Sequence, residues 1–306
     1  MTLKQLRYLR EISRQSLNIS AAAAVLHTSQ PGISRQIQDL ERELGVDLLM
    51  RRKNRVLGLT ETGHAVLDVA ERMLSDAENI RRIAHETRNE AGGQLTLATS
   101  HLHARYSLRV PIKEFIKRHP EVQLRLLQAD VDDVPRLVES NEADVGISTD
   151  VVNEHPSLIL LTSGPIRRSA IMPKGHPLAG RKKVTLSDLA RYPIVGYNPR
   201  SRSGQIIAKA FRDHALEPRF VVSASDSDVI KTYVEEGLGI AVVPTLSLTG
   251  REAKVHAMDA THLFPRSATI VSLRRSAYLR DYVIDFVSTL VPGLDREAIQ
   301  RAGASP

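Results

Sequence analysis

Apolar residues recur at helical spacing through the first 45 residues. The pattern predicts a helix at the amino terminus and another over residues 30–44, each with its apolar side chains on one face. Between them we expect an alanine-rich helix over residues 21–26, capped by Ser20, and the turn 27–29. Two helices across a tight turn form a helix-turn-helix, with the first helix packed underneath. The two apolar stripes consist of Leu3, Leu6, Leu9 and Ile12, and of Ile33, Ile37, Leu40 and Leu44.

The polar face of the helix over residues 30–44 carries side chains of the kinds that bond base edges or phosphates. Pro31 lies in its first turn, where proline is pre-organised for a helix. An ordinary amphipathic hairpin with a solvated polar face is the alternative interpretation. On the DNA-binding interpretation, the contacting residues of this helix are Gln30, Pro31, Ser34, Arg35 and Gln38.

The segment that follows is typical of a wing, a hairpin with a charged tip. Residues 48–58 (LLMRRKNRVLG) predict two short apolar strands around a basic turn. Residues 1–58 hold ten Lys or Arg and five Asp or Glu, so ten minus five, or +5, of the formal charge of +7 lies in this part. Such a concentration indicates phosphate binding. The candidate contacts of the wing are Arg51, Arg52, Lys53 and Arg55.

A long helix is predicted beyond the wing, from a Thr60 cap to about Asn89. Its apolar residues, at three- and four-residue steps, form a narrow stripe about 40 Å long. Pairing with the same helix of a second copy would bury that stripe and place two DNA readers on two half-sites. Packing against its own chain is the alternative. The stripe consists of Val66, Val69, Met73, Ala77, Ile80 and Ala84.

Residues 91–93 (AGG) mark a domain boundary, after which short apolar strands alternate with helices. This alternation indicates an α/β domain. Residues 302–306 are expected to form a loose tail. We predict strands over 94–99, 122–127, 145–148, 158–161, 170–172, 194–197, 220–223, 240–243 and 270–273, and helices over 105–119, 133–140, 203–216, 226–236 and 278–290.

Length and composition exclude several classes of protein. The chain has 306 residues, 42% of them apolar, which is typical of a globular protein with two or three domains. It has no apolar run long enough to span a bilayer, and its first ten residues lack the features of a secretory signal, so we expect a cytoplasmic protein without membrane contact. The absence of cysteine excludes disulfides and thiolate chemistry. No enzyme motif is evident, and we expect neither catalysis nor a cofactor.

The order of winged helix-turn-helix, long helix and α/β half ending in GLGIAVVP (237–244) resembles the LysR-type transcriptional regulators over essentially the whole chain. Within that family, three segments resemble the CysB/Cbl branch, which controls sulfur assimilation. They are TSHLHARYSL (99–108), SDSDVIKTYVEEGLGI (225–240) and LRRSAYLRDYVIDF (273–286).

The resemblance implies an α+β multidomain protein with a winged helix-turn-helix (1–60), a linker and dimerisation helix (61–90) and an effector-binding domain (91–306). That domain would resemble periplasmic binding proteins, with lobe I over 93–163 and 267–306 and lobe II over 164–266. It also implies a homodimer or homotetramer that binds promoter DNA, contacts RNA polymerase and holds an effector between its lobes. Effector closure of the cleft would then change DNA bending.

The residues themselves support an anion cleft. Thr99 and Ser100 end a strand where a helix begins, so hydroxyls and free N–H groups meet at a positive helix terminus. The loop 198–204 (NPRSRSG) offers Arg202 and Ser203 at the start of another helix. Simple helix capping is the alternative for the Ser and Thr residues. By the resemblance, Thr149 lies at the same cleft.

Two positions depart from the branch, which usually has Thr-Thr-His-Thr-Gln where this chain has Thr-Ser-His-Leu-His at 99–103. After His101, Leu102 removes a hydroxyl and His103 replaces an amide with a group that titrates near neutral pH. The branch's Thr-Gly-Arg aligns with residues 202–204 or with residues 203–205. The ligand is therefore open among sulfate, adenylyl sulfate and organosulfur anions. A metal at the two histidines is disfavoured because no third ligand is evident and Arg105 is near.

Three interpretations stay open beside a sulfur regulator: a LysR-type regulator with a non-sulfur ligand, a nucleoid-type DNA binder, and a solute-binding protein with an added basic domain. The missing signal sequence disfavours the last of these.

Overall fold

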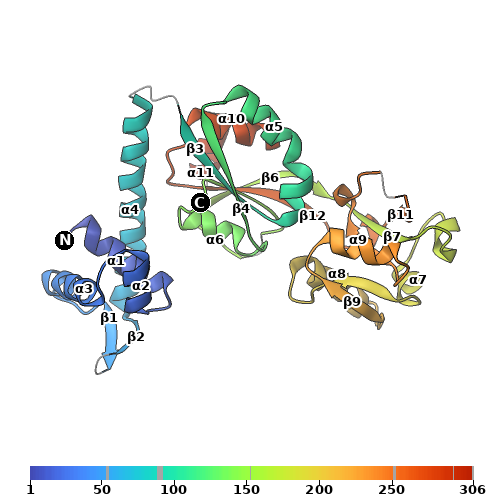
Figure 1. The fold of residues 1–306 in the computed structure, drawn as a ribbon, viewed down its shortest axis with the longest axis horizontal. Helices are drawn as coiled ribbons and strands as arrows, with labels where there is room; N and C mark the ends of the chain where they lie inside the picture. The colour runs from blue at the N-terminus through green and yellow to red at the C-terminus, as the bar shows by residue number, and fades with distance from the viewer. Residues whose placement is uncertain (53–54, 88–91, 152, 251–252, 292, 305–306) are drawn as a thin grey trace. The chain divides into compact units, whose positions relative to one another are not determined.

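A computed structural model describes residues 1–52, 55–87, 92–151, 153–250, 253–291 and 293–304 (Figure 1). The chain divides into two compact units, one of residues 1–90 with 276–278 and one of residues 91–275 with 279–306. Among the described residues, no helix combines the length and the apolar character that a bilayer crossing requires.

The amino-terminal unit contains the predicted helices α1 (Leu3–Arg14), α2 (Ile19–Val25) and α3 (Gln30–Leu44). The stripes of α1 and α3 meet in one apolar core, although their outer members Leu3 and Leu44 are exposed. The predicted cap of α2 is wrong. Asn18, not Ser20, caps this helix, because its side chain accepts a hydrogen bond from the Ala21 N–H at 3.0 Å and starts the helix earlier.

The predicted wing is confirmed as an antiparallel hairpin of β1 (Leu49–Arg52) and β2 (Arg55–Leu59), while its tip, residues 53 and 54, lies outside the described residues. Glu41, buried on α3, anchors the hairpin. One of its carboxylate oxygens accepts the N–H groups of Leu48 and Leu49 at 2.9 and 3.0 Å. The other binds the Arg51 guanidinium at 2.8 Å.

The long helix α4 (Glu61–Thr87) begins at the predicted Thr60 cap, whose hydroxyl accepts the Gly63 N–H at 2.8 Å. Its apolar residues form two faces. Leu67, Ala70 and Leu74 are buried in the core of the amino-terminal unit. Of the predicted stripe, Val66 packs against this core, whereas Val69, Met73 and Ile80 are 45%, 37% and 67% exposed.

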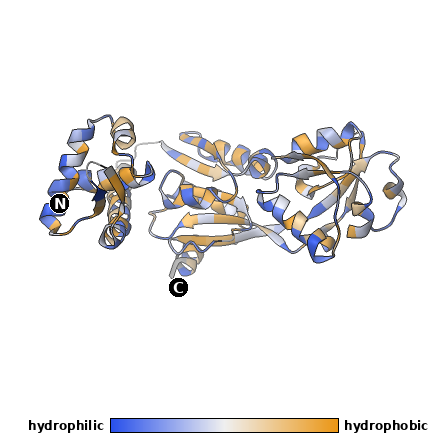
Figure 2. Ribbon diagram, turned by 90° about the horizontal axis from the view of Figure 1, so that it is seen from below, coloured by the Kyte–Doolittle hydropathy of each residue, from blue (hydrophilic) through white to orange (hydrophobic). Residues whose placement is uncertain are grey.

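The carboxy-terminal unit contains a five-stranded sheet, a three-stranded sheet and a two-stranded pair (Figures 1 and 2). The first has the strand order β4-β3-β5-β12-β6, with β3, β4 and β5 parallel and β12 antiparallel to both β5 and β6. Helices α5 (Arg109–Arg118), α10 (Asp281–Leu290) and α11 (Arg296–Ala304) share a core with this sheet, and α6 (Val134–Glu139) packs in a separate one. The strands are β3 (Gly93–Thr99), β4 (Val122–Gln128), β5 (Val145–Thr149), β6 (Leu158–Ile166) and β12 (Ser267–Arg274).

The second sheet has the order β10-β7-β11, and the parallel pair β8-β9 joins it through a bridge between Ile194 and Ile240. Helices α7 (Leu186–Ala190), α8 (Arg202–Asp213) and α9 (Ser227–Glu235) pack on these strands. We call the first sheet with its helices lobe I and the second lobe II. The strands are β7 (Arg168–Pro173), β8 (Ile194–Tyr197), β9 (Phe220–Ala224), β10 (Ala241–Pro244) and β11 (Val255–Asp259).

All nine strands predicted for the α/β half are present, and the differences are local. The helix predicted over 105–119 is split into a π-helical turn, η1 (His103–Ser107), and α5. Strand β11 and helices α7 and α11 were not predicted. The loose tail predicted from residue 302 is wrong as far as residue 304, which ends α11. β6 reaches Ile166 within the first sheet, so the chain leaves lobe I after the predicted limit of residue 163.

We expect Glu41→Ala to destabilise the wing, because the substitution removes the acceptor of two buried N–H groups and the partner of Arg51. The free energy of opening should fall by about 3 kcal/mol. Hydrogen exchange of the Leu48 and Leu49 amides in the full chain measures it. Glu43→Ala, whose carboxylate is exposed on the same helix, is the matched control. Equal exchange in both variants would contradict the anchoring role of Glu41.

Candidate functional site

The candidate DNA-reading face of α3 is solvent-accessible. Ser29 caps the helix and Pro31 occupies its first turn. Gln30, Pro31, Arg35 and Gln38 are exposed, and Ser34 is half-buried. The Gln30 amide donates a hydrogen bond to the Ser34 hydroxyl at 3.1 Å. Side chains with donors and acceptors therefore stand on the face opposite the core, as the apolar stripe predicts.

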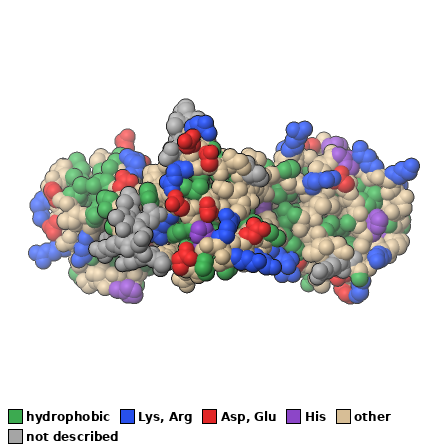
Figure 3. All heavy atoms as spheres, turned by 90° about the horizontal axis from the view of Figure 1, so that it is seen from above, with side chains coloured by type: hydrophobic (Ala, Val, Ile, Leu, Met, Phe, Trp, Pro, Cys, Tyr) green, Lys and Arg blue, Asp and Glu red, His purple; other side chains and the backbone are tan. Residues whose placement is uncertain are grey.

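The wing arginines are not equivalent. Both Arg51 and Arg52 are exposed, but the side chain of Arg51 is only 30% exposed and is already bound to Glu41. Lys53 and the side chain of Arg55 lie outside the described residues. Among the described wing residues, Arg52 is therefore the stronger candidate for a phosphate contact, because Arg51 already binds Glu41. On the face drawn in Figure 3, Lys and Arg side chains lie on both units and mix with acidic ones.

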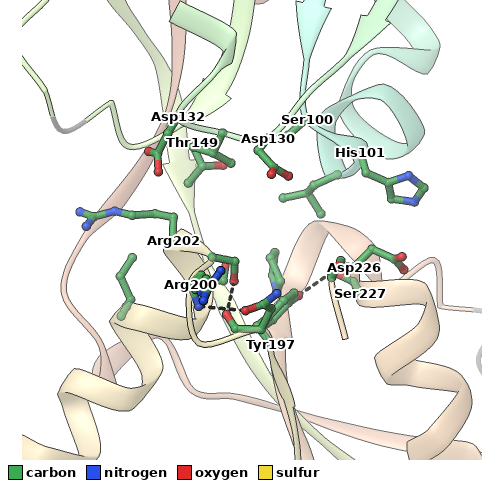
Figure 4. A pocket seen from close by; sticks show the side chains of 18 of the residues that line it. Ser100, His101, Asp130, Asp132, Thr149, Tyr197, Arg200, Arg202, Asp226 and Ser227 are labelled. Carbon is green, nitrogen blue, oxygen red and sulfur yellow. Dashed lines mark hydrogen bonds between the residues drawn. The ribbon is translucent and has the colours of Figure 1, made fainter. Parts of the chain in front are cut away.

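A cavity of about 420 Å³ lies between lobes I and II (Figure 4). Lobe I contributes the segments that follow the carboxyl ends of its parallel strands: Ser100 after β3, residues 129–132 after β4 and Thr149 at the end of β5. Lobe II contributes the end of β8 and the starts of α8 and α9. Crevices at the carboxyl ends of parallel strands are where α/β proteins bind small molecules.

Six of the eight predicted effector residues line this cavity, and two do not. Thr99 is completely buried behind the wall, and so is His103. Sequence spacing alone could not separate these two from Ser100, because the alternation of β3 ends in a π-helical turn. The six lining residues are Ser100, His101, Leu102, Thr149, Arg202 and Ser203.

Two buried polar atoms in the wall have no hydrogen-bond partner among the described residues, namely Ser100 Oγ and Arg202 Nε. Buried polar groups are nearly always paired, so such atoms in a cavity wall point to a ligand or ordered water. Ser100 comes from lobe I and Arg202 from the start of α8 in lobe II. A ligand that bonds both would bridge the two lobes.

Sequence reasoning missed several lining residues of lobe II, among them Arg168 and Tyr197. Arg168 is 4% exposed, and its guanidinium donates to Ser267 Oγ at 2.8 Å, while burial lowers its pKa. The Tyr197 hydroxyl lies 2.6 Å from Ser227 Oγ, and burial raises the pKa of Tyr197. Arg168 could have been found from the sequence, because it is a charged residue at the start of a largely apolar strand.

The charge of the cavity wall is balanced. Three arginines and three aspartates line it, together with His101. The arginines come from lobe II, whereas two of the aspartates, Asp130 and Asp132, follow β4 in lobe I. The prediction of an anion cleft took only basic and hydroxyl side chains into account. It did not include Asp130 and Asp132, which follow a parallel strand. The six charged residues are Arg168, Arg200, Arg202, Asp130, Asp132 and Asp226.

His103 is packed inside lobe I, where burial lowers its pKa to about 4. Its Nδ1 lies 2.8 Å from Ser107 Oγ and its Nε2 lies 3.1 Å from Thr149 Oγ1. Because both ring nitrogens are bonded there, His103 does not join His101 in a common site. The sequence predicted that His103 would contact the ligand, but in the structure its ring is hydrogen-bonded to Thr149 instead.

Beside the cavity, Asp228 of α9 joins lobe II to lobe I. Its carboxylate contacts Arg105 at 2.8 Å, His101 at 3.2 Å and the Tyr106 hydroxyl, and on its own helix it contacts Lys231 at 3.1 Å. Burial opposes the charge of Asp228, but the hydrogen bonds outweigh burial and lower its pKa.

His101, Asp226 and Asp228 place three potential metal-ligand atoms within 4.8 Å of one another. A cation at this position would have to compete with Arg105 and Lys231 for the Asp228 carboxylate.

Comparison with known proteins gives consistent matches. The family model described as bacterial regulatory helix-turn-helix protein, lysR family, matches residues 3–64, and the LysR substrate binding domain matches residues 88–294. The HTH-type transcriptional regulator SsuR of Burkholderia cenocepacia is 42% identical over 300 residues, covering 98% of this chain and 97% of that protein. The HTH-type transcriptional regulator CysB of the same species is 40% identical over 303 residues, covering 99% and 97%.

Among solved structures, the carboxy-terminal unit is similar to the crystal structure of the cofactor-binding domain of the Cbl transcriptional regulator. The TM-score is 0.65 at 35% identity, and the match covers 71% of this chain and 96% of that domain.

The buried His103 predicts a pH-dependent stability. The folded state holds the ring neutral down to about pH 4, whereas the unfolded chain binds a proton near pH 6.5. The contribution of neutral His103 is therefore fully present above pH 6.5, and the free energy of unfolding should fall by about 3 kcal/mol between pH 6.5 and 4. Urea unfolding of the full chain and of His103→Gln measures this difference. Parallel pH dependences in the two proteins would contradict it.

Proposed function

The chain belongs to the LysR family of bacterial transcriptional regulators, and on that premise we propose that it regulates genes of cysteine or organosulfur metabolism in response to a small anionic effector. The cavity between lobes I and II, with the unpaired Ser100 Oγ and Arg202 Nε in its wall, is the observation that carries the effector half of this proposal. The similarity to SsuR and CysB over nearly the whole chain supports the sulfur assignment.

The DNA half of the proposal rests on α3 and the wing. In this arrangement α3 lies in the major groove, where Arg35 and Gln38 meet base edges or phosphates, and Arg52 of the wing meets the backbone. The exposed stripe of α4 supports pairing with a second copy, because Val69, Met73 and Ile80 would lose their contact with water there. Two readers in a dimer, or four in a tetramer, then match repeated half-sites.

The effector is larger than sulfate in this proposal. A volume of about 420 Å³ falls within the range of small-molecule pockets, and the five heavy atoms of sulfate would occupy a small part of it. The apolar side chains of Leu102 and Ile206 in the wall also suit a carbon skeleton better than a bare inorganic anion. An organosulfur anion or adenylyl sulfate meets both conditions.

The proposed mechanism is a shift between two arrangements of the lobes. An effector that bonds Ser100 of lobe I and Arg202 of lobe II favours the arrangement in which both are close, since a ligand shifts an equilibrium by its differential affinity for the two states. In an oligomer bound to DNA in the cytoplasm, that shift changes the bend of the promoter and the contact with RNA polymerase.

We expect Arg52→Ala to weaken operator binding through the loss of one phosphate contact. The slope of log K against log salt should decrease by about 1, because each phosphate contact releases about one counterion. Fluorescence anisotropy with operator DNA at several salt concentrations measures the slope. Lys113→Ala, which removes one positive charge from the exposed side of α5, is the matched control. An unchanged slope for Arg52→Ala would place this arginine outside the interface.

We expect an effector to raise the melting temperature of the full chain, since it binds only the folded state. At a concentration of 100 Kd the stabilisation is about 2.7 kcal/mol. A screen of sulfate, thiosulfate, adenylyl sulfate, O-acetylserine and alkanesulfonates measures the selectivity. Ser100→Ala should abolish the shift, whereas Ser223→Ala, on the exposed side of β9, should keep it. A shift that survives Ser100→Ala would move the ligand away from this cavity.

A further inference from the structure

The hydroxyl group of Thr149 is held from behind by a chain of hydrogen bonds. Thr149 Oγ1 lies 3.1 Å from His103 Nε2, and His103 Nδ1 lies 2.8 Å from Ser107 Oγ. The Ser107 hydroxyl in turn donates to the backbone carbonyl of His103 at 3.3 Å. This series of hydrogen bonds therefore runs from the His103 carbonyl oxygen, through Ser107 and the buried His103 ring, to Thr149 in the cavity wall.

The direction of these bonds depends on which ring nitrogen of His103 carries the proton. A hydroxyl has one proton, and a neutral imidazole has one N–H and one bare nitrogen. In the arrangement in which Ser107 donates its proton to the carbonyl of His103, the proton of the 2.8 Å bond belongs to His103 Nδ1. Nε2 is then bare and accepts the proton of Thr149. Complete burial keeps the ring neutral, which leaves Nε2 without a proton of its own.

Thr149 consequently presents only oxygen lone pairs to the cavity. The carboxylates of Asp130 and Asp132, which also accept hydrogen bonds, stand on the same wall beside it (Figure 4). Their carboxylate oxygens have no protein partner among the hydrogen bonds and ion pairs of the described residues. This part of lobe I therefore accepts hydrogen bonds. Across the cavity, Arg200 and Arg202 of lobe II donate them (Figure 4).

We propose that the effector is bipolar: its anionic group binds the arginines of lobe II, and an amino or hydroxyl group at its other end donates to Thr149, Asp130 and Asp132 of lobe I. Leu102 and Ile206 line the cavity and suit a short alkyl chain between the two ends. This inference rests on the proposed function for its sulfur chemistry, which makes aminoalkanesulfonates and hydroxyalkanesulfonates the ligand class. An anion without a donor group would make no hydrogen bond to this acceptor side of the wall.

The direction of the hydrogen bonds can be tested without a ligand. In the full chain labelled with 15N-histidine, the ring of His103, identified by its loss in His103→Gln, should carry its proton on Nδ1 and leave Nε2 bare. A proton on Nε2 would overturn the proposal, because Thr149 would then be free to donate to an anion.

The ligand class is tested by calorimetry of the full chain with three sulfonates that differ at one end. We expect 3-aminopropanesulfonate and 3-hydroxypropanesulfonate to bind at least tenfold more tightly than propanesulfonate. The advantage of the amine should shrink in Thr149→Val and in Asp132→Asn, and should be kept in Thr149→Ser, which retains the hydroxyl.

Equal affinity for the three sulfonates would overturn the proposal, and so would binding of none of them. Operator binding, measured on the same preparation, distinguishes these results from a failure of the proposed function. A chain that binds operator DNA but no bipolar sulfonate would remain a regulator with another ligand class.

Discussion

The hydrogen bond between the buried His103 ring and Thr149 joins the ends of two parallel strands and fixes one wall of the cavity. β3 leads into the π-helical turn that carries His103, and β5 ends at Thr149. Burial keeps the ring neutral, and in the direction proposed above its bare Nε2 then accepts the proton of Thr149. The positions of Ser100 and Thr149 in the wall, and hence what lobe I offers a ligand, depend on this one packed side chain.

Charge is the second constraint on the cavity. Arginines of lobe II face aspartates of lobe I across a space of about 420 Å³, and Asp228 beside it gathers Arg105 and Lys231 into a contact between the lobes. A ligand that enters the cavity meets charges of both signs.

Much of the fold was predictable from the sequence because its elements follow their own periodicity. The stripe of α3, the basic hairpin and the Thr60 cap were predicted from local patterns and are present in the structure. The cap of α2 was misplaced because Ser20 and Asn18 are both good caps, and only the hydrogen bond to Ala21 decides between them. Strand β11 was missed because its hydrophobic pattern is weak and its pairing with β7 is long-range.

The candidate site was less predictable, since burial decides its chemistry. Residues 99–103 are consecutive, yet Thr99 and His103 lie behind the wall while Ser100 and Leu102 lie in it. Arg168 and Asp132 are far apart in the sequence and meet the same cavity only because the second sheet is inserted between strands of the first. No local pattern carries that information.

In the proposed function, a small molecule in this cavity controls where and how the protein binds DNA. The decisive experiment is a footprint of the full chain on promoter DNA of sulfur-metabolism genes, with and without 3-aminopropanesulfonate. We expect a few discrete protected sites whose pattern changes when the sulfonate is present. Broad coating of the DNA, or discrete sites whose pattern is the same with every organosulfur anion and with none, would contradict it.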